Sequence, residues 1–333
     1  MLNRPALLGI ACLLSLFVGS ARGADPSMKL IDVRKIWDEG AHNAFTDLLH
    51  HNGAWYCVFR EGKGHVSQDG GLRVLTSRDG QQWVSAALVT LPGTDLRDPK
   101  ISVSPDGKLC LCGAGAWHRP KESETELQSY LWYSKDGQDW GEAIPIGDRN
   151  HWIWRIVWRK TTGYGIGYTK AEDNLRARLY QTTDGRDFTV LVPNMLPNQG
   201  YVNETAVLFL PDETALCLIR RDGRLNEALL GTASAPYTDW TFQTLGTQVG
   251  GPQMLQLPDG RIIVAGRRYP GGAKTQLWWL DPATATLTEA LTLPSGGDTS
   301  YPGLVFHEGK LWVSYYSSHA GKTSIYLAQV ELP

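Results

Sequence analysis

The sequence predicts an all-β fold, a six-bladed β-propeller, and the main reason is a repeated hairpin. A pattern of apolar strand, tight turn and second apolar strand recurs at intervals of about 50 residues, which suits four-stranded propeller blades. A glycine at the turn supplies the positive φ angle that tight hairpins need. The six turns are centred near Gly53, Gly107, Gly163, Glu213, Gly260 and Gly309.

A second repeat ends the third strand of three blades, with the pattern S/T-x-D-G-x-x-W and Phe for Trp in one copy. The aspartate can accept local hydrogen bonds that fold a turn, while the aromatic ring packs between strands. The pattern resembles the Asp-box of sialidase-type propellers, and this resemblance implies a sialidase-like six-bladed propeller. A remnant in the fourth blade ends at Trp240. The three copies are Ser77–Trp83, Ser134–Trp140 and Thr182–Phe188.

The last blade lacks one strand of its own. Its strands begin at Tyr301, Leu311 and Ser324, whereas Met28–Trp37 is a spare strand at the other end of the chain. We expect this segment to complete blade six and close the ring, which would remove free sheet edges. A single domain, residues 24–333, then accounts for the whole mature chain.

The first 23 residues predict a cleaved signal peptide. Arg4 supplies a positive charge, Ala6–Val18 form an apolar run, and Ala21–Gly23 place small residues at the cleavage site. The apolar run is too short for a comfortable membrane span. We therefore expect a secreted or periplasmic protein that begins near Ala24 and has no membrane partner after cleavage.

Charge and residue spacing exclude several kinds of partner. The formal net charge of -2 argues against nucleic acid or an acidic membrane surface as a bulk partner. No histidine cluster has metal-ligand spacing, so we expect no zinc site. The sequence implies no other metal and no organic cofactor. Cys110 and Cys112 lie two apart in one strand and cannot easily bridge each other, so we expect the cysteines of the mature chain to be buried apolar residues. We also expect a monomer.

Three arginines stand at the same distance from their hairpin turns. Counting seven residues beyond the turn centre gives Arg60 in blade one, Arg220 in blade four and Arg267 in blade five. Arginine clusters bind carboxylates through paired, charge-assisted hydrogen bonds. The count therefore predicts an anion-binding trio at one mouth of the central funnel. The alternatives are salt bridges to neighbours such as Glu61 or Asp222, or a role for the adjacent Arg221 or Arg268.

Polar residues also begin the innermost strands, where these strands reach the funnel. A charged residue that leads an apolar central strand requires a partner or a function. A salt bridge is the structural alternative for Glu204, and ordinary packing is the alternative for Tyr301. The residues at these positions are Asp47, Asp98, Arg155, Glu204 and Tyr301.

The order Glu204, Arg220, Arg267, Tyr301 resembles the second half of an exo-sialidase active site. The resemblance implies that the arginines grip a substrate carboxylate, that Tyr301 is the nucleophile and that Glu204 is its base. A neutral phenol suits such a substrate, because a carboxylate beside the reacting carbon would repel a carboxylate nucleophile.

The first half of the chain departs from this resemblance. Sialidases carry Arg-Ile-Pro at the start of blade one, where this chain has His42–Phe45, and Arg97-Asp98-Pro99 resembles that motif one blade later. Asp69 lies on the loop where sialidases place their acid/base aspartate. Asp47 and Asp98 are alternatives for this acid.

These features predict a secreted glycoside hydrolase of the sialidase-like superfamily that acts on an acidic glycan, sialic acid or a related sugar. Tyr301, Glu204 and Asp69 would be catalytic. The alternatives are a non-catalytic glycan-binding propeller, or a hydrolase or lyase for a different uronic or ulosonic acid, because fold alone does not decide between them. The expected substrate contacts are Arg60, Arg220, Arg267, Asp47, Asp98 and Arg97.

Overall fold

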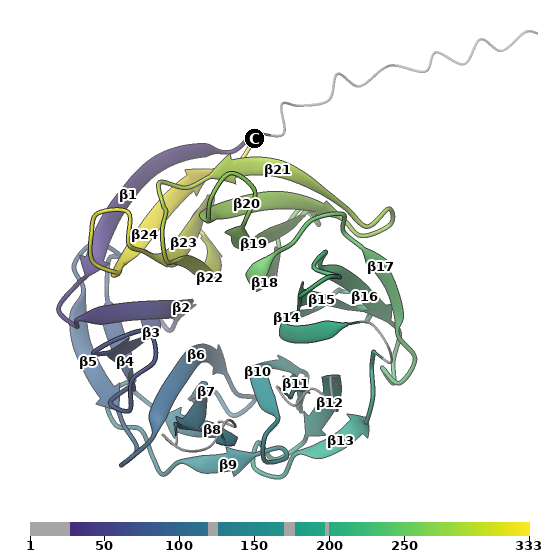
Figure 1. Ribbon diagram of the computed structural model, residues 1–333, viewed down its shortest axis with the longest axis horizontal. Coiled ribbons are helices and arrows are strands. Elements are labelled where there is room, and N and C mark those ends of the chain that lie inside the picture. The colour runs from purple at the N-terminus through teal and green to yellow at the C-terminus, as the bar shows by residue number, and fades with distance from the viewer. Residues whose placement is uncertain (1–26, 119–125, 170–176, 197–199) are drawn as a thin grey trace, which may run out of the picture.

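The computed structural model describes residues 27–118, 126–169, 177–196 and 200–333, and these form a β-propeller (Figure 1). Within these residues, 24 strands make six four-stranded sheets around one axis. The described residues contain no helix, and hence no helix that could span a membrane. The predicted six-bladed fold is confirmed, whereas the predicted signal peptide lies outside the described residues.

In the first five blades the strands follow one another from the axis to the rim. Blade one contains β2 (His42–His51), β3 (Ala54–Gly62), β4 (Gly71–Ser77) and β5 (Val84–Val89). Blade two contains β6 (Asp95–Val103), β7 (Leu109–Trp117), β8 (Glu126–Ser134) and β9 (Ile144–Ile146). Blade three contains β10 (Trp152–Arg159), β11 (Thr162–Tyr168), β12 (Ala177–Thr182) and β13 (Thr189–Val192). Blades four and five contain β14 (Tyr201–Phe209), β15 (Ala215–Asp222), β16 (Leu229–Ala233), β17 (Thr241–Thr244), β18 (Gly250–Gln256), β19 (Ile262–Arg268), β20 (Lys274–Asp281) and β21 (Thr286–Thr292).

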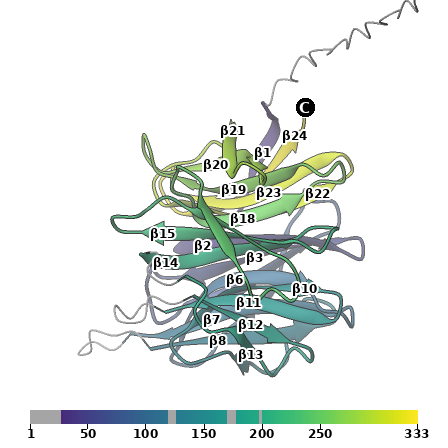
Figure 2. The ribbon, with the colours of Figure 1, turned by 90° about the vertical axis from the view of Figure 1, so that its right-hand side faces the viewer.

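Blade six closes the ring with strands from both ends of the chain. Three of its strands are consecutive, and the fourth, at the rim, is the N-terminal strand β1. β1 pairs antiparallel with β24 along its length, and the two strands lie side by side in Figure 2. The predicted closure is confirmed. The four strands are β22 (Thr299–His307), β23 (Lys310–Ser317), β24 (Ser324–Glu331) and β1 (Lys29–Trp37).

The repeated S/T-x-D-G-x-x-W segments fold the turns between the third and fourth strands of three blades. In the first copy, Asp79 Oδ1 accepts the backbone N–H groups of Gln81 and Gln82 at 2.8 and 2.9 Å. The indole Nε1 of Trp83 donates to the carbonyl of Gly80 at 3.2 Å. These bonds explain why the motif needs an aspartate, and the φ of 67° at Gly80 explains the glycine. The same pair of backbone bonds forms around Asp136 and Asp184.

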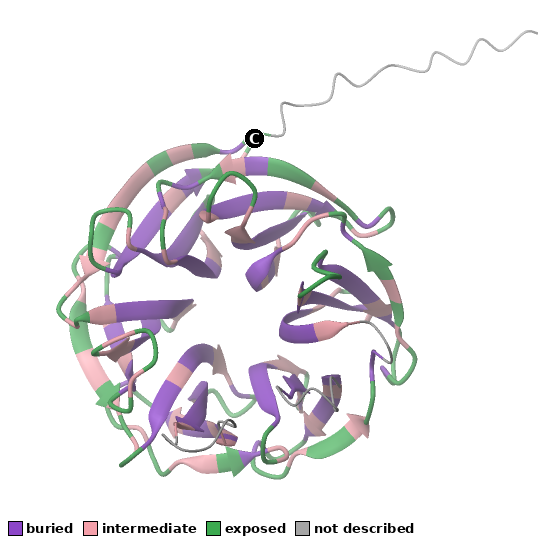
Figure 3. Ribbon diagram, in the orientation of Figure 1, coloured by how far each residue is buried: buried purple, intermediate pink, exposed green. Residues whose placement is uncertain are grey.

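Burial falls from the axis to the rim, and the core lies between neighbouring blades (Figure 3). The inner strands are mostly buried, whereas the rim strands are largely half-buried or exposed. The described cysteines are free and buried, and burial raises the pKa of their thiols, which keeps them uncharged. They therefore serve as small apolar residues, as predicted. These cysteines are Cys57, Cys110, Cys112 and Cys217.

Gly303 lies where the innermost strands of blades six and one meet. A Cβ atom there would lie 2.7 Å from the carbonyl carbon of Asp47 and closer still to the backbone nitrogen of Leu48. We expect Gly303→Ala to lower the free energy of unfolding by about 1–3 kcal/mol, because the backbone of the neighbouring strand cannot move away from the added methyl group without cost. Denaturant unfolding would measure it, with Gly141→Ala as the control because a Cβ there meets only an atom 3.8 Å away. Equal stability of the two variants would contradict this packing.

Candidate active site

A β-bulge interrupts the innermost strand of every blade close to its start. In blade one, two residues between Ala44 and Asp47 lie opposite a single residue of β3, and the other five blades repeat this arrangement. Bulges re-aim side chains and often occur beside active sites. Here four of the first bulged residues line one cavity, described next. The first bulged residues are Phe45, Asp98, Trp154, Asn203, Gly251 and Tyr301.

The bulges surround a cavity of about 180 Å³ at the beginning of the inner strands. Its wall combines aromatic rings, carboxylates and arginines from five of the six blades. Such a mixture suits a sugar, which has apolar ring faces and many hydroxyl groups. The lining residues are Phe45, His65, Arg97, Asp98, Trp152, Tyr168, Tyr201, Asn203, Glu204, Arg220, Asp222 and Tyr301.

Tyr301 and Glu204 meet in this cavity although they come from blades six and four. The phenol of Tyr301 donates to Glu204 Oε1 at 2.5 Å. Arg220 Nη1 lies 2.9 and 2.8 Å from the two oxygens of Glu204 and 3.0 Å from the Tyr301 hydroxyl. The backbone N–H of Gly251 donates to Glu204 Oε2 at 2.7 Å. The carboxylate is thus held on three sides, with one oxygen directed at the phenol.

Two further arginines flank the pair. The guanidinium of Arg267 lies 5.2 Å from the centre of the Tyr301 ring, and its Nη2 donates to the Tyr316 hydroxyl at 2.8 Å. Arg97 lines the cavity from blade two, where its guanidinium lies 5.4 Å from the centre of the Phe45 ring. Arg220 and Arg267 therefore place positive charge beside the Tyr301 phenol, and Arg97 adds a third guanidinium to the same cavity wall.

Burial and the neighbouring charges together set the protonation states of the pair. Burial raises the pKa of the Tyr301 phenol well above 10.0, and the charge of Glu204 raises it further, so that Arg220 and Arg267 only partly offset these effects. Burial also acts to raise the pKa of Glu204, but the charge of Arg220 and the hydrogen bond from Tyr301 lower it below 4.5 overall. Arg220 and Arg267 thus favour the phenolate, but burial and Glu204 outweigh them, so that in the free protein a neutral phenol faces an ionised carboxylate.

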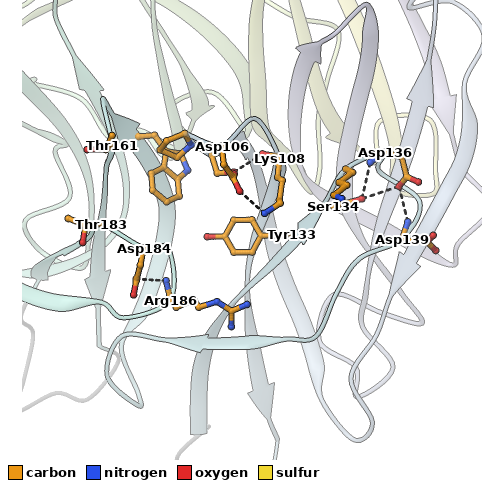
Figure 4. Close-up of a pocket in the computed structure, with 14 residues that line it drawn as sticks. Asp106, Lys108, Tyr133, Ser134, Asp136, Asp139, Thr161, Thr183, Asp184 and Arg186 are labelled. Carbon is orange, nitrogen blue, oxygen red and sulfur yellow. Dashed lines mark hydrogen bonds and ion pairs between the residues drawn. The ribbon is translucent and has the colours of Figure 1, made fainter.

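A larger cavity, of about 600 Å³, lies at the opposite end of the strands, between blades two and three (Figure 4). The carboxylates in its wall are largely committed to their own turns. Asp136 Oδ1 accepts two backbone N–H groups, and Asp106 is bonded to Ser104 and Lys108 at 2.6 and 2.5 Å. The convergent polar groups that chemistry needs are therefore found in the smaller cavity.

Comparisons with known proteins identify the fold. No protein-family model matches the sequence, and no curated protein matches it. A Dyadobacter fermentans protein of unknown function superimposes with a TM-score of 0.82, at 18% identity over 93% of this chain and 100% of that one. An α-L-arabinanase of Penicillium chrysogenum gives 0.70 at 16% identity, over 91% of this chain and 98% of the other. Trypanosoma rangeli sialidase gives 0.67 at 12% identity, over 87% of this chain and 55% of the sialidase.

This chain has the sialidase-like propeller fold. At such low identity the likeness concerns architecture, and the chemistry has to be argued from individual residues. The sialidase-like propeller places Tyr301, Glu204, Arg220, Arg97 and Asp98 in its cavity wall. The remaining predicted residues lie elsewhere.

Arg60 lies outside the cavity wall, which corrects its predicted part in a carboxylate-binding trio. Its side chain is completely buried. Nε donates to Asp95 Oδ1 at 2.8 Å, Nη1 donates to the carbonyl of Gly64 at 2.7 Å, and Nη2 donates to the hydroxyl of Ser67 at 3.0 Å. Arg60 therefore fixes the loop that follows β3, and its guanidinium is already committed to protein partners.

The distance between hairpin turn and bulge differs by one residue between blades, so that the count from the turns did not compare equivalent positions. Relative to the bulge, Arg60 and Arg267 are equivalent to Arg221, and Arg220 lies opposite the bulge itself. Arg221 behaves like Arg60: it is buried, and its Nε donates to the carbonyl of Glu227 in the next loop at 2.7 Å. Counting from the turns therefore gave Arg220 the same position as Arg60 and Arg267. Relative to the bulges, Arg220 lies one residue away from that position.

Of the three aspartates considered as an acid, only Asp98 lines the cavity. Asp47 is buried beside the axis, where it accepts Arg155 Nη1 at 2.8 Å. Asp69 is exposed on the loop after β3, where it accepts the backbone N–H of Lys63 at 3.3 Å. The structure therefore places Asp69, the predicted acid, and Asp47, a predicted substrate contact, outside the cavity wall.

The sequence-based prediction missed part of the cavity wall. Asp222 accepts Arg220 Nε at 3.1 Å and the amide of Asn203 at 2.7 Å, so it helps to orient the arginine that holds Glu204. The sequence could have indicated Asp222, because this residue follows the arginines at the end of an apolar strand. It could not have indicated His65, because the partners of His65 lie far away along the chain.

Proposed function

We propose that this protein is a glycoside hydrolase in which Tyr301 is the nucleophile and Glu204 is its base. The observation that carries the proposal is the 2.5 Å contact between the Tyr301 hydroxyl and Glu204 Oε1, with Arg220 bound to both groups. A nucleophile within hydrogen-bond reach of a base, which a third group orients, is the arrangement of covalent catalysis.

Each group has a defined part in the two steps. The phenolic oxygen of Tyr301 attacks the anomeric carbon while Glu204 takes its proton, the glycosidic bond breaks, and Asp98 protonates the departing oxygen. Asp98 then removes a proton from water, the water oxygen attacks the anomeric carbon, and the bond to Tyr301 breaks. Glu204 returns the proton to the phenolate, which restores both residues.

The proposed substrate is an acidic sugar, sialic acid or a relative whose carboxylate lies beside the reacting carbon. A neutral phenol is not repelled by that carboxylate, and Arg97 and Arg220 line the cavity with Arg267 next to Tyr301. Arginine forks match carboxylate oxygens in pairs. We also propose that the protein acts outside the cytoplasm as a monomer, and that it needs no nucleic acid, membrane or organic cofactor.

A neutral glycoside is the second candidate, and the charge balance of the cavity favours it. Asp98, Glu204 and Asp222 face the arginines in the cavity wall and compensate their charge. Similar solved structures include an α-L-arabinofuranosidase of Fusarium graminearum, with a TM-score of 0.71 at 14% identity. On such a substrate, Glu204 and Asp98 would form the reacting carboxylate pair.

A screen of fluorogenic sialosides, uronides and arabinofuranosides against the purified protein tests these candidates. Hydrolysis of an acidic glycoside supports the first candidate, and hydrolysis of arabinofuranosides alone supports the second. Binding of acidic sugars without hydrolysis of any glycoside would instead support a non-catalytic glycan-binding propeller.

The acid role of Asp98 gives a prediction of its own. We expect Asp98→Asn to lower kcat by about 10²-fold or more on substrates with poor leaving groups, and much less on activated aryl glycosides. Asparagine tolerates the positive φ of 50° at this position, so the backbone should be preserved. Asp69→Asn is the matched control, with rates near those of the parent protein. A leaving-group effect in Asp69→Asn and none in Asp98→Asn would reverse the assignment.

A further inference from the structure

Two imidazoles and a carboxylate converge beside the cavity from three separate segments. His42 begins β2, His65 lies on the loop after β3, and Asp298 lies on the loop before β22. His42 Nε2 is 3.2 Å and His65 Nδ1 is 2.8 Å from the same oxygen, Oδ2 of Asp298. All three atoms lie within 4.8 Å of one another. Three atoms that can each donate an electron pair thus lie close enough together to bind one metal ion.

Hydrogen bonds orient the carboxylate so that one oxygen is reserved for the histidines. Asp298 Oδ1 accepts the Tyr316 hydroxyl at 2.7 Å and lies 3.4 Å from Arg267 Nη2. The backbone N–H of Asp298 donates to the Ser318 hydroxyl at 2.9 Å. Metal sites use such outer contacts to fix the carboxylates that bind the ion.

The cluster is accessible from solvent and from the cavity. The side chains of His42, His65 and Asp298 are 12%, 49% and 29% exposed. His65 also lines the cavity, where its ring packs edge-on against Phe45 with the ring centres 5.2 Å apart. An ion could therefore enter from solvent and keep a coordination position open towards the cavity.

We propose that His42, His65 and Asp298 bind a divalent transition-metal ion, with Zn²⁺ as the expected ion. Two imidazole nitrogens and one carboxylate oxygen, with a fourth position open, form a donor set that zinc accepts, whereas Ca²⁺ and Mg²⁺ prefer oxygen ligands alone. Zinc bonds of about 2.0–2.1 Å in a tetrahedron place the ligand atoms roughly 3.3–3.4 Å apart. The observed contacts of 2.8 and 3.2 Å are close to that spacing.

This site also explains why sequence spacing predicted no metal. Zinc motifs that are read from sequence place ligands a few residues apart on one element. Here the ligands are at positions 42, 65 and 298, and closure of the ring between blades six and one brings them together.

Titration of the chelator-treated protein with Co²⁺ alone tests the site, because tetrahedral Co²⁺ absorbs strongly in the visible range. We expect one Co²⁺ per chain, displaced by one Zn²⁺, and a loss of affinity in His65→Ala that exceeds the about 10- to 100-fold cost of losing an outer contact. His118→Ala is the matched control, since His118 is half-buried and pairs with a carboxylate, Asp95, at 2.9 Å. It should bind Co²⁺ like the parent protein.

Absence of stoichiometric Co²⁺ and Zn²⁺ binding would overturn the proposal, and so would parental affinity in a folded His65→Ala variant. The contacts would then be imidazole–carboxylate hydrogen bonds only. Because His65 is on an exposed loop, its substitution should leave the thermal unfolding midpoint of the metal-free protein almost unchanged. Metal occupancy is measured without a glycoside, so a negative result leaves the proposed hydrolase function standing.

Discussion

Tyr301→Phe should lower kcat on the glycoside that the protein hydrolyses by about 10³-fold or more, equivalent to about 4 kcal/mol of transition-state stabilisation. The substitution removes only the hydroxyl that contacts Glu204 and Arg220. Glu204 would keep its bonds to Arg220 and Gly251, so the cavity should retain its shape. Steady-state kinetics, with the KM measured separately, would give the result.

Tyr315→Phe is the matched control for this experiment. Tyr315 is buried on β23, and its hydroxyl donates to the carbonyl of Pro294 at 2.9 Å, away from the cavity. Both variants should lose about 1 kcal/mol of stability with their hydrogen bonds, but only Tyr301→Phe should lose turnover. Full activity in Tyr301→Phe combined with an inactive Glu204→Gln would reject the nucleophile and favour the neutral glycoside candidate.

The fold could be predicted because its signal is local and repeated. Each hairpin turn needs a residue that accepts a positive φ angle, and Gly53, Gly107, Gly260 and Gly309 all adopt one. Closure of the ring could be predicted by counting strands, since the sequence of blade six supplies three strands and the N-terminal segment supplies one strand with no blade of its own. None of these inferences required knowledge of which residues touch across the ring.

The contact between Tyr301 and Glu204 depends on features that the sequence does not display. Tyr301 has a φ of 51°, which is unfavourable for a bulky residue and is stabilised here by its surroundings. Gly251 provides part of these surroundings, because a Cβ there would lie 2.6 Å from Tyr301 Cγ. The sequence order indicated that the two residues belong together, but the bulge that turns the phenol towards Glu204 is a property of the packed ring.

Arg60 shows the opposite case, in which a regular spacing led to a wrong role. An arginine after an apolar strand looks the same in sequence whether it binds a substrate or the next loop. Register does not separate the two roles, because Arg267 has the same register as Arg60 and lies beside Tyr301. What differs for Arg60 is the loop after β3, which binds its guanidinium through Gly64 and Ser67. Arg220 reaches Glu204, whereas Arg60 reaches Asp95.

Arg60→Met should therefore reduce the free energy of unfolding by about 3–5 kcal/mol, because it leaves the completely buried Asp95 without its closest charged partner. Lys108→Met is the control, since the exposed pair of Lys108 and Asp106 should contribute at most about 1 kcal/mol. Denaturant unfolding would measure both changes.

A double-mutant cycle separates this charge effect from lost packing. Adding Asp95→Asn to Arg60→Met removes the uncompensated charge, so the double variant should be less destabilised than the sum of the two single variants. Arg97 and His118 also contact Asp95, and they limit the recovery because they would in turn lose a charged partner. The KM of the folded Arg60→Met protein should change less than substitution of a direct substrate contact would change it, since Arg60 reaches the cavity only through the loop that carries His65. Parental stability together with a KM raised many-fold would show instead that Arg60 holds the substrate.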